Sequence, residues 1–240
     1  MMTLLASVAS YADTVSVDLL YDLRHTTDAQ DNPDNFPVVE LKVFYPQSFG
    51  SFLLKSEIDL DGANHNVSEA FNEISQSIKL GSATLGGLPL FAHLEYSGGL
   101  GVFNHASGGF YIPNAYIMGL EYPFDLQGAN CDVVVGLRDT NLGIPSYDPM
   151  LTIYAQRYFF NHKLLIANSL EAWTTSNEAE GGTSSQSPAG KFGSWELESE
   201  AWYKVAKELS VGTYIRTTRN VYVISNRWLV YPSFGVRYAF

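Results

Sequence analysis

His93, Glu95 and Ser97 are the residue types that serine hydrolases combine as base, orienting acid and nucleophile. They occupy every second position of one segment, so in an extended strand all three side chains would project from the same face. Successive members would then lie about 7 Å apart, which is too far for direct hydrogen bonds along a strand. The spacing therefore predicts no hydrolytic triad, and we expect the chain not to be an enzyme.

Other catalytic chemistry leaves no signature in the sequence. There is no zinc motif, no glycine-rich phosphate loop and no dinucleotide-binding fingerprint. The single Cys131 provides neither an intrachain disulfide nor a metal cluster. We therefore predict no catalytic residues, no metal and no cofactor. The formal net charge of −11 argues against nucleic acid as a partner, because phosphate binding needs clustered Lys and Arg.

The sequence pattern predicts that the polar residues are positioned by β-strands. From Val230 to Phe240 every second residue is apolar or proline, and the residues between include Ser233 and Arg237. The same period of two recurs in the segments 15–24, 39–45, 90–97, 131–138, 195–205 and 209–216. Weaker candidates fill the gaps at 51–60, 68–80, 109–122, 149–160 and 163–174. The pattern predicts about twelve strands of the length that crosses a bilayer.

The connections between these strands alternate in length. Short connections are predicted at 46–50, 81–88, 123–128, 161–162 and 206–207. Mostly longer ones fall at 25–36, 61–67, 98–108, 139–148, 175–191 and 217–228. Short periplasmic turns that alternate with longer external loops are typical of bacterial outer-membrane barrels. We predict an all-β, antiparallel up-and-down barrel over residues 13–240 as a single domain, with residues 1–12 as the remnant of a signal peptide.

A soluble β-sandwich would also alternate, with its apolar face inward. Aromatic residues near the predicted strand ends favour the membrane, where they would form interfacial girdles: Tyr45, Tyr96, Tyr122, Tyr203, Tyr238 and Phe240. The prediction is a barrel in the outer membrane of a Gram-negative bacterium, in contact with lipid and lipopolysaccharide and inserted by the barrel assembly machinery. Glu73, Glu95 and Arg237 would face the lumen, and Leu94, Phe234 and Val236 would face lipid.

The inward face would collect acids, bases and aromatic rings. About half of its charges would form salt bridges between strands, and the others would line a passage. Rings beside hydrogen-bonding groups can stack on flat solutes. The candidates for lining the pore and contacting a solute are Asp18, Glu40, Lys42, Glu73, His93, Glu95, Tyr111, Arg138, Tyr154, Glu171, Trp173, Trp202, Tyr214 and Arg216.

Three stretches of the sequence resemble Tsx-like nucleoside-specific channel-forming proteins. They are Ala70-Phe71-Asn72-Glu73-Ile74-Ser75, the segment from Leu88 to Gly99, and the ending Phe234-Gly235-Val236-Arg237-Tyr238-Ala239-Phe240. The similarity is greater still to uncharacterised relatives of that family in Bacteroides-type bacteria. The resemblance implies a monomeric barrel of twelve strands whose narrow lumen binds nucleosides through aromatic and ionisable side chains. Of these side chains, Glu73 lies in the best-matched strand.

Pattern and resemblance together predict a channel for passive diffusion of small polar solutes, nucleosides among them. One alternative is a non-conducting barrel that holds a lipoprotein or a larger envelope complex as its protein partner. An outer-membrane lipid hydrolase is the enzymatic alternative.

Overall fold

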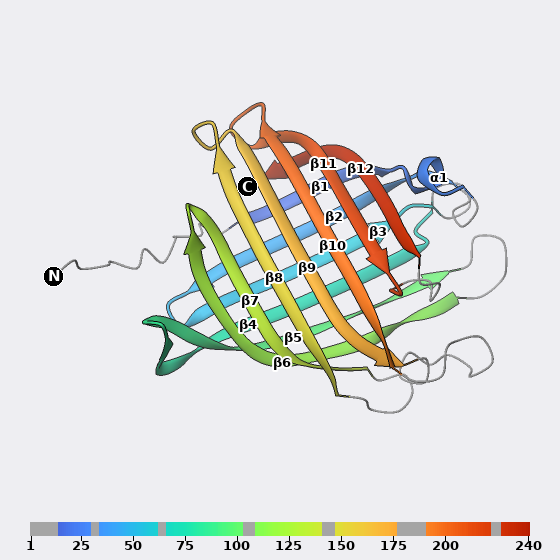
Figure 1. Ribbon diagram of the computed structural model, residues 1–240. Coiled ribbons are helices and arrows are strands. Elements are labelled where there is room, and N and C mark those ends of the chain that lie inside the picture. Colours follow the sequence, from blue (N-terminus) through green and yellow to red (C-terminus); the bar gives the residue numbers. More distant parts are fainter. Residues whose placement is uncertain are drawn as a thin grey trace.

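The computed structural model describes residues 14–29, 34–61, 66–102, 109–140, 147–176, 191–221 and 227–240. These residues form twelve strands and one short helix (Figure 1). The first six strands are β1 (Thr14–Asp22), β2 (Phe36–Gln47), β3 (Gly50–Asp59), β4 (Glu69–Leu85), β5 (Leu88–Val102) and β6 (Gly109–Leu126). The others are β7 (Ala129–Thr140), β8 (Asp148–Phe159), β9 (Leu164–Ser176), β10 (Lys191–Lys204), β11 (Leu209–Arg219) and β12 (Trp228–Ala239).

Each strand pairs antiparallel with its neighbours in sequence, and β1 pairs with β12, so the sheet is a closed barrel. The closing register places Asp18 opposite Arg237. Closure leaves no open sheet edge, which is the only way a sheet can satisfy its backbone hydrogen bonds in lipid. The predicted up-and-down barrel is therefore confirmed. The predicted signal-peptide remnant lies outside the described residues.

The short helix α1 (Arg24–Thr27) follows β1. The guanidinium of Arg24 binds the carboxylate of Asp22 at 2.9 Å and lies between the rings of Phe36 and Tyr231. Burial alone would lower the pKa of Arg24, but the hydrogen bond to Asp22 and the charges of Asp22 and Asp59 raise it overall. No helix in the described part of the chain is long and apolar enough to span a membrane.

The polarity of the two faces of the barrel wall is the reverse of that in a soluble protein. Outward-facing Leu94 and Phe234 are 45 % and 53 % exposed, whereas inward-facing Asp18 and Glu40 are 0 % and 1 % exposed. A soluble sandwich would bury the first pair and expose the second. An apolar exterior around a charged interior is the arrangement of an outer-membrane barrel. The predicted facing of Glu73, Glu95, Leu94, Phe234, Val236 and Arg237 is confirmed.

Exposed aromatic side chains surround the barrel near its short turns. Tyr45, Tyr203 and Tyr238 lie at the turn ends of β2, β10 and β12, and the ring of Phe240 contacts that of Tyr238 edge-on at 5.0 Å. Aromatic rings are favoured at the boundary between lipid and water. Tyr96 differs from the expectation, because it lies in the middle of β5, where its ring contacts Tyr116.

Two strands continue beyond their predicted ends. β4 extends to Leu85 and β6 to Leu126, so most of the predicted connections at 81–88 and 123–128 is strand. The reason is turn chemistry: the central residues Gly86–Gly87 and Gln127–Gly128 all have positive φ. Two-residue turns of this kind match the twist of a hairpin and allow the ladder to run up to them. The β4–β5 ladder contains an irregularity between Lys79 and Thr84.

The orientation of side chains can be tested by thiol labelling. In a background with Cys131 replaced by serine, Leu94→Cys or Val236→Cys should react with a lipid-soluble maleimide and resist a charged, water-soluble one. Glu95→Cys, one residue from position 94, is the matched control and should react with the charged reagent. If the charged reagent labels positions 94 and 236 in intact outer membranes, the facing assignment is wrong.

Candidate functional site in the barrel lumen

The candidate residues come from ten strands, and the strand register shows which of them face the lumen. Direct cross-strand pairs share a face, so the register places Lys42 with Ser16, Glu171 with Glu196 and Tyr154 with Asp132. This inward placement holds for every candidate whose side chain is described; the side chain of Tyr111 lies outside the described part. Position alone does not establish contact with a solute, so that role stays a prediction.

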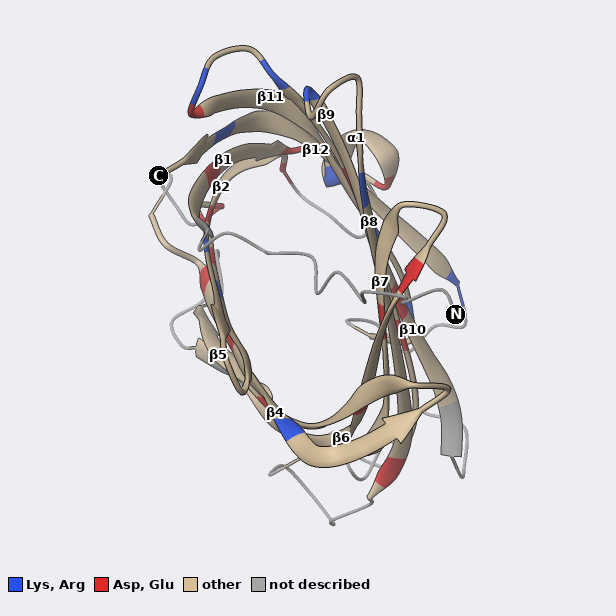
Figure 2. Cartoon of the chain, turned by 90° about the vertical axis from the view of Figure 1, so that its left-hand side faces the viewer, with Lys and Arg blue, Asp and Glu red and all other residues tan. Residues whose placement is uncertain are grey.

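Three ion pairs cross the lumen between β10–β11 on one wall and β2–β3 on the other. Lys42 binds Glu200 at 2.5 Å, Lys55 binds Glu198 at 2.9 Å, and Arg216 binds Glu57 at 2.7 Å. Four strands, β11, β12, β1 and β2, separate β10 from β3 along the wall. These contacts therefore cross the bore instead of following the wall. Figure 2 shows the corresponding oval outline of the barrel. We call the set Glu40, Lys42, Lys55, Glu57, Glu198, Glu200, Arg216 and Arg237 the cross-lumen network.

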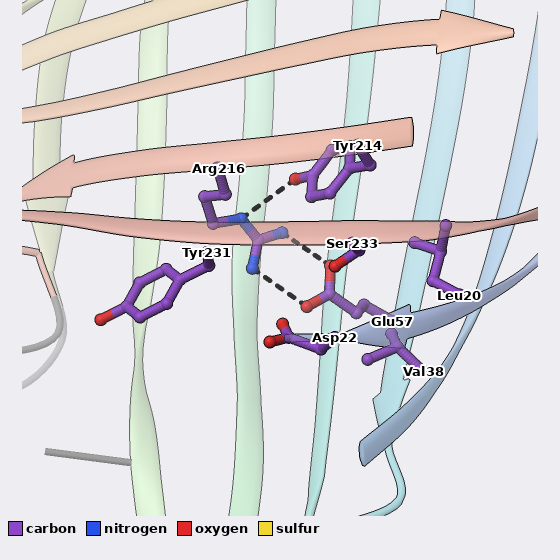
Figure 3. A pocket seen from close by; sticks show the side chains of 8 residues that line it. All are labelled: Leu20, Asp22, Val38, Glu57, Tyr214, Arg216, Tyr231 and Ser233. Carbon is purple, nitrogen blue, oxygen red and sulfur yellow. Dashed lines mark hydrogen bonds and ion pairs between the residues drawn. The ribbon is translucent and has the colours of Figure 1, made fainter. Parts of the chain in front are cut away.

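Glu198 is at the centre of this network. Its carboxylate accepts hydrogen bonds from Lys55, from Arg216 at 3.1 Å and from the hydroxyl of Tyr214. Arg216 also donates two hydrogen bonds to Glu57, at 3.0 and 2.7 Å (Figure 3). The hollow beside Arg216 has a volume of only about 10 Å³, which is room for about one water molecule. This part of the lumen is filled by side chains.

Trp202 and Tyr214 belong to that filled region, with exposed fractions of 2 % and 6 %. The guanidinium carbon of Arg237 lies 4.2 Å from the centre of the Trp202 ring. The indole N–H of Trp202 donates a hydrogen bond to Glu200 at 2.7 Å. A Cβ atom on Gly212 would stand 2.6 Å from the indole, so glycine is needed on β11 to admit this ring. Both aromatic residues hold the ion pairs and have no open face on which a solute could stack.

The wall formed by β4–β9 differs. His93 Nδ1 lies 2.9 Å from Glu121, and its Nε2 lies 3.2 Å from Glu95. The expectation that His93 and Glu95 are too far apart was wrong, because long side chains on alternate residues lean toward each other across the backbone spacing. Ser77, not Ser97, joins this group by donating to Glu121. Serine and histidine thus share Glu121 as partner. The register places Ser77 opposite His93, but no hydrogen bond joins these two described residues as nucleophile and base.

The aromatic candidates on β8 and β9 have different surroundings. Tyr154 is half-buried and donates from its hydroxyl to Gln156 at 2.9 Å, so part of its ring borders the lumen. Trp173 is buried with Ile117 and Met150, and the guanidinium of Arg138 lies 5.0 Å from the centre of its ring. Within the described residues, no group of three or more His, Cys, Asp and Glu is arranged to hold a metal ion.

Comparison with known proteins identifies the fold. No protein-family model matches the sequence. No curated protein matches it either. Solved structures that resemble the barrel are the KdgM porin, at 12 % identity and a TM-score of 0.51, and the NanC porin, at 12 % and 0.53. The outer membrane phospholipase A from Escherichia coli is also similar, at 11 % and 0.51. The matches cover 94 % of this chain and 99 %, 98 % and 90 % of those chains, respectively.

The chain has the fold of the bacterial outer-membrane porins. With the apolar exterior described above, this fold places it in the outer membrane. The Tsx family in particular is not singled out by these likenesses. Because a phospholipase shares the same architecture, the fold does not separate a channel from a hydrolase, and the absence of an enzymatic activity stays a prediction.

Sequence reasoning missed the grouping of the inward charges. The candidate set includes Glu40, Lys42 and Arg216 but omits their partners Glu198 and Glu200. The alternate acids Glu196, Glu198 and Glu200 could have indicated this grouping, because three inward acids on one strand need basic partners from other strands. Which bases they meet depends on how flat the barrel is, and alternation does not specify that.

The network predicts that a glutamate-to-glutamine substitution affects the stability of the barrel differently at positions 198 and 171. Glu198→Gln removes the acceptor charge for Lys55 and Arg216, so it should lower the free energy of unfolding by about 1.5–3 kcal/mol. Glu171→Gln is the control: Glu171 has no hydrogen bond or ion pair among the described residues, and its loss should be neutral or slightly stabilising. Urea unfolding in lipid vesicles measures both. Equal destabilisation would contradict the central role of Glu198.

Proposed function

We propose that the protein is an outer-membrane channel for passive diffusion of small polar solutes. The observation that carries this proposal is the division of the lumen. The cross-lumen network fills the side bounded by β10–β12 and β1–β3 with ion pairs, whereas Glu73 and Glu171 on β4 and β9 are partly exposed and have no hydrogen bond or ion pair among the described residues. A carboxylate that lacks a protein partner stays ionised only where water solvates it. A solvated polar strip along β4–β9 would provide a passage for small solutes.

Nucleosides are the solutes that we propose first. The support is the resemblance of the segments around Glu73, Leu88–Gly99 and Arg237 to nucleoside-specific channels, together with the position of Tyr154. Its half-buried ring lies opposite Asp132 in the register, so a flat face stands beside a hydrogen-bonding group. A base could stack on the ring while ribose hydroxyls bind the neighbouring carboxylates. With Trp202 and Tyr214 enclosed in the network, Tyr154 is the strongest aromatic candidate.

A non-conducting scaffold is the alternative from another class. The specific observation in its favour is the network itself, because ion pairs across the bore narrow the barrel. A scaffold that holds a lipoprotein or an envelope complex would need a rigid wall but no passage. The two functions differ in one measurable property, the ionic current through a planar bilayer.

Single-channel recording decides between them. Purified barrel should give small, discrete current steps, and added adenosine or thymidine should block them at millimolar concentration or below. Sugars and amino acids serve as comparison solutes. If another solute blocks the current and nucleosides do not, the protein is a channel but nucleosides are not its substrate. Silence in the bilayer, together with co-purification of a fixed protein partner, would favour the scaffold.

A substitution at Tyr154 tests the stacking contact. Tyr154→Leu removes the flat ring and should weaken nucleoside block about tenfold, since one base–aromatic stack contributes about 1–3 kcal/mol. Tyr154→Phe keeps the ring, loses only the hydroxyl bonded to Gln156, and should retain most of the block. The concentration for half-block in single-channel traces measures both variants. Equal block by wild type and Tyr154→Leu would exclude stacking at this residue.

A further inference from the structure

Positive and negative charges are unevenly distributed around the lumen. In the described residues, each of the bases Arg24, Lys42, Lys55, Arg216 and Arg237 has a carboxylate within 4 Å, and all five lie in or beside β1–β3 and β11–β12. We call the inward side chains of β4–β9 the acidic wall. It carries eight carboxylates against three bases; the acids are Glu69, Glu73, Glu95, Glu121, Asp125, Asp132, Asp148 and Glu171, and the bases are Lys79, His93 and Arg138.

The bases near the acidic wall do not balance it. His93 contacts two carboxylates, those of Glu95 and Glu121, through its two ring nitrogens. Lys79 is exposed on β4, and Arg138 lies opposite Asp148 in the register, with its guanidinium over the ring of Trp173. The case of Glu73 is the clearest, because the register places Lys55 directly opposite it. The ammonium of Lys55 nevertheless binds Glu198 at 2.9 Å, on the other side of the lumen. The cross-lumen network thus takes up a base that the acidic wall would otherwise use.

Glu171 is surrounded by charges of its own sign. It lies opposite Glu196 in the register, and its principal electrostatic interactions are with Glu95, Glu73, Glu196 and Glu198, all of them carboxylates. Glu73 and Glu95 are on β4 and β5, whereas Glu171 is on β9, so these repulsions act across the lumen. Like charges placed directly opposite each other destabilise a sheet. Neither Glu73 nor Glu171 has a hydrogen bond or ion pair within the described part of the chain.

We propose that the passage along β4–β9 selects solutes by charge: it favours cations, admits neutral solutes and repels anions. This inference rests on the proposed function, because only a conducting barrel can be selective. The physical basis is that a cleft lined by one sign of charge with low-dielectric walls focuses the field and concentrates counter-ions. The acids that face the passage outnumber its bases. Applied to nucleosides, the same field discriminates against their phosphorylated forms, and small organic amines are the charged class that it favours.

The reversal potential of the wild-type barrel is the first test. Across a tenfold KCl gradient at low ionic strength, K⁺ should permeate roughly five times more readily than Cl⁻, as expected for a potential of about one kT or more in the bore. The preference should shrink toward 1 M salt, where the Debye length falls to about 3 Å. A conducting barrel with no preference, or with a preference for Cl⁻, overturns this inference and leaves the channel intact. A silent barrel contradicts the proposed function itself.

Matched variants assign the selectivity to the acidic wall. Glu73→Gln combined with Glu171→Gln should bring the K⁺/Cl⁻ permeability ratio down to about twofold or less. The control is Asp34→Asn combined with Glu208→Gln, which also removes two acidic charges and should leave the ratio unchanged. Both positions lie outside the strands; Asp34 is exposed, and Glu208 is partly exposed and paired with Lys207. Heat-modifiable migration on gels reports folding of each variant. Glu171→Gln alone relieves repulsion, so it should fold and lower the ratio by a smaller amount. A wild-type ratio in the folded Glu171→Gln barrel and in the double variant would overturn the assignment.

Discussion

The ion pairs across the lumen are the interaction on which the rest of the structure depends. A closed sheet of twelve strands is wider than the small barrels whose interior is filled by side chains. Lys42, Lys55 and Arg216 nevertheless reach carboxylates on the opposite wall, at 2.5, 2.9 and 2.7 Å. These contacts require the two walls to approach, and the barrel is oval accordingly (Figure 2). They also determine which charges are neutralised and which remain along the rest of the wall.

Charge pairing on one side of the lumen has a consequence on the other. Glu198 and Glu200 draw Lys55, Lys42 and Arg237 toward β10, so the base closest to Glu73 in the register is taken from it. On β4–β9, Glu95 and Glu121 contact His93, whereas Glu73 and Glu171 then depend on water for solvation, because lipid surrounds the outside of the wall. The same set of contacts therefore closes one part of the bore and keeps the other part polar. Charge pairing and an open polar surface are thus properties of two different regions of a single wall.

Most of the architecture was predictable from alternation, together with the aromatic residues near the strand ends that favoured a membrane barrel. The period of two gave the strand count, the inward position of Glu73, Glu95 and Arg237, and the outward position of Leu94 and Phe234, because a strand places successive side chains on opposite faces. Strand ends were less certain: β4 and β6 run on to Leu85 and Leu126, since positive φ at Gly86–Gly87 and Gln127–Gly128 allows a tight turn without earlier unpairing. The roles of Trp202 and Tyr214 were also missed, because stacking on a solute and packing against Arg237 or Glu198 use the same residue types.

The sequence by itself determined which side chains share a face of each strand, and its aromatic residues near the strand ends favoured the membrane as the environment. These properties are local, since each follows from the residue type and the parity of its position along a strand. Only the tertiary structure decided which inward charges meet. Lys55 is opposite Glu73 on the adjacent strand, yet it binds Glu198 on a strand 143 positions further along the chain. That choice depends on the distance between opposite walls, which is set by closure and flattening of the whole barrel and is not encoded in any single strand.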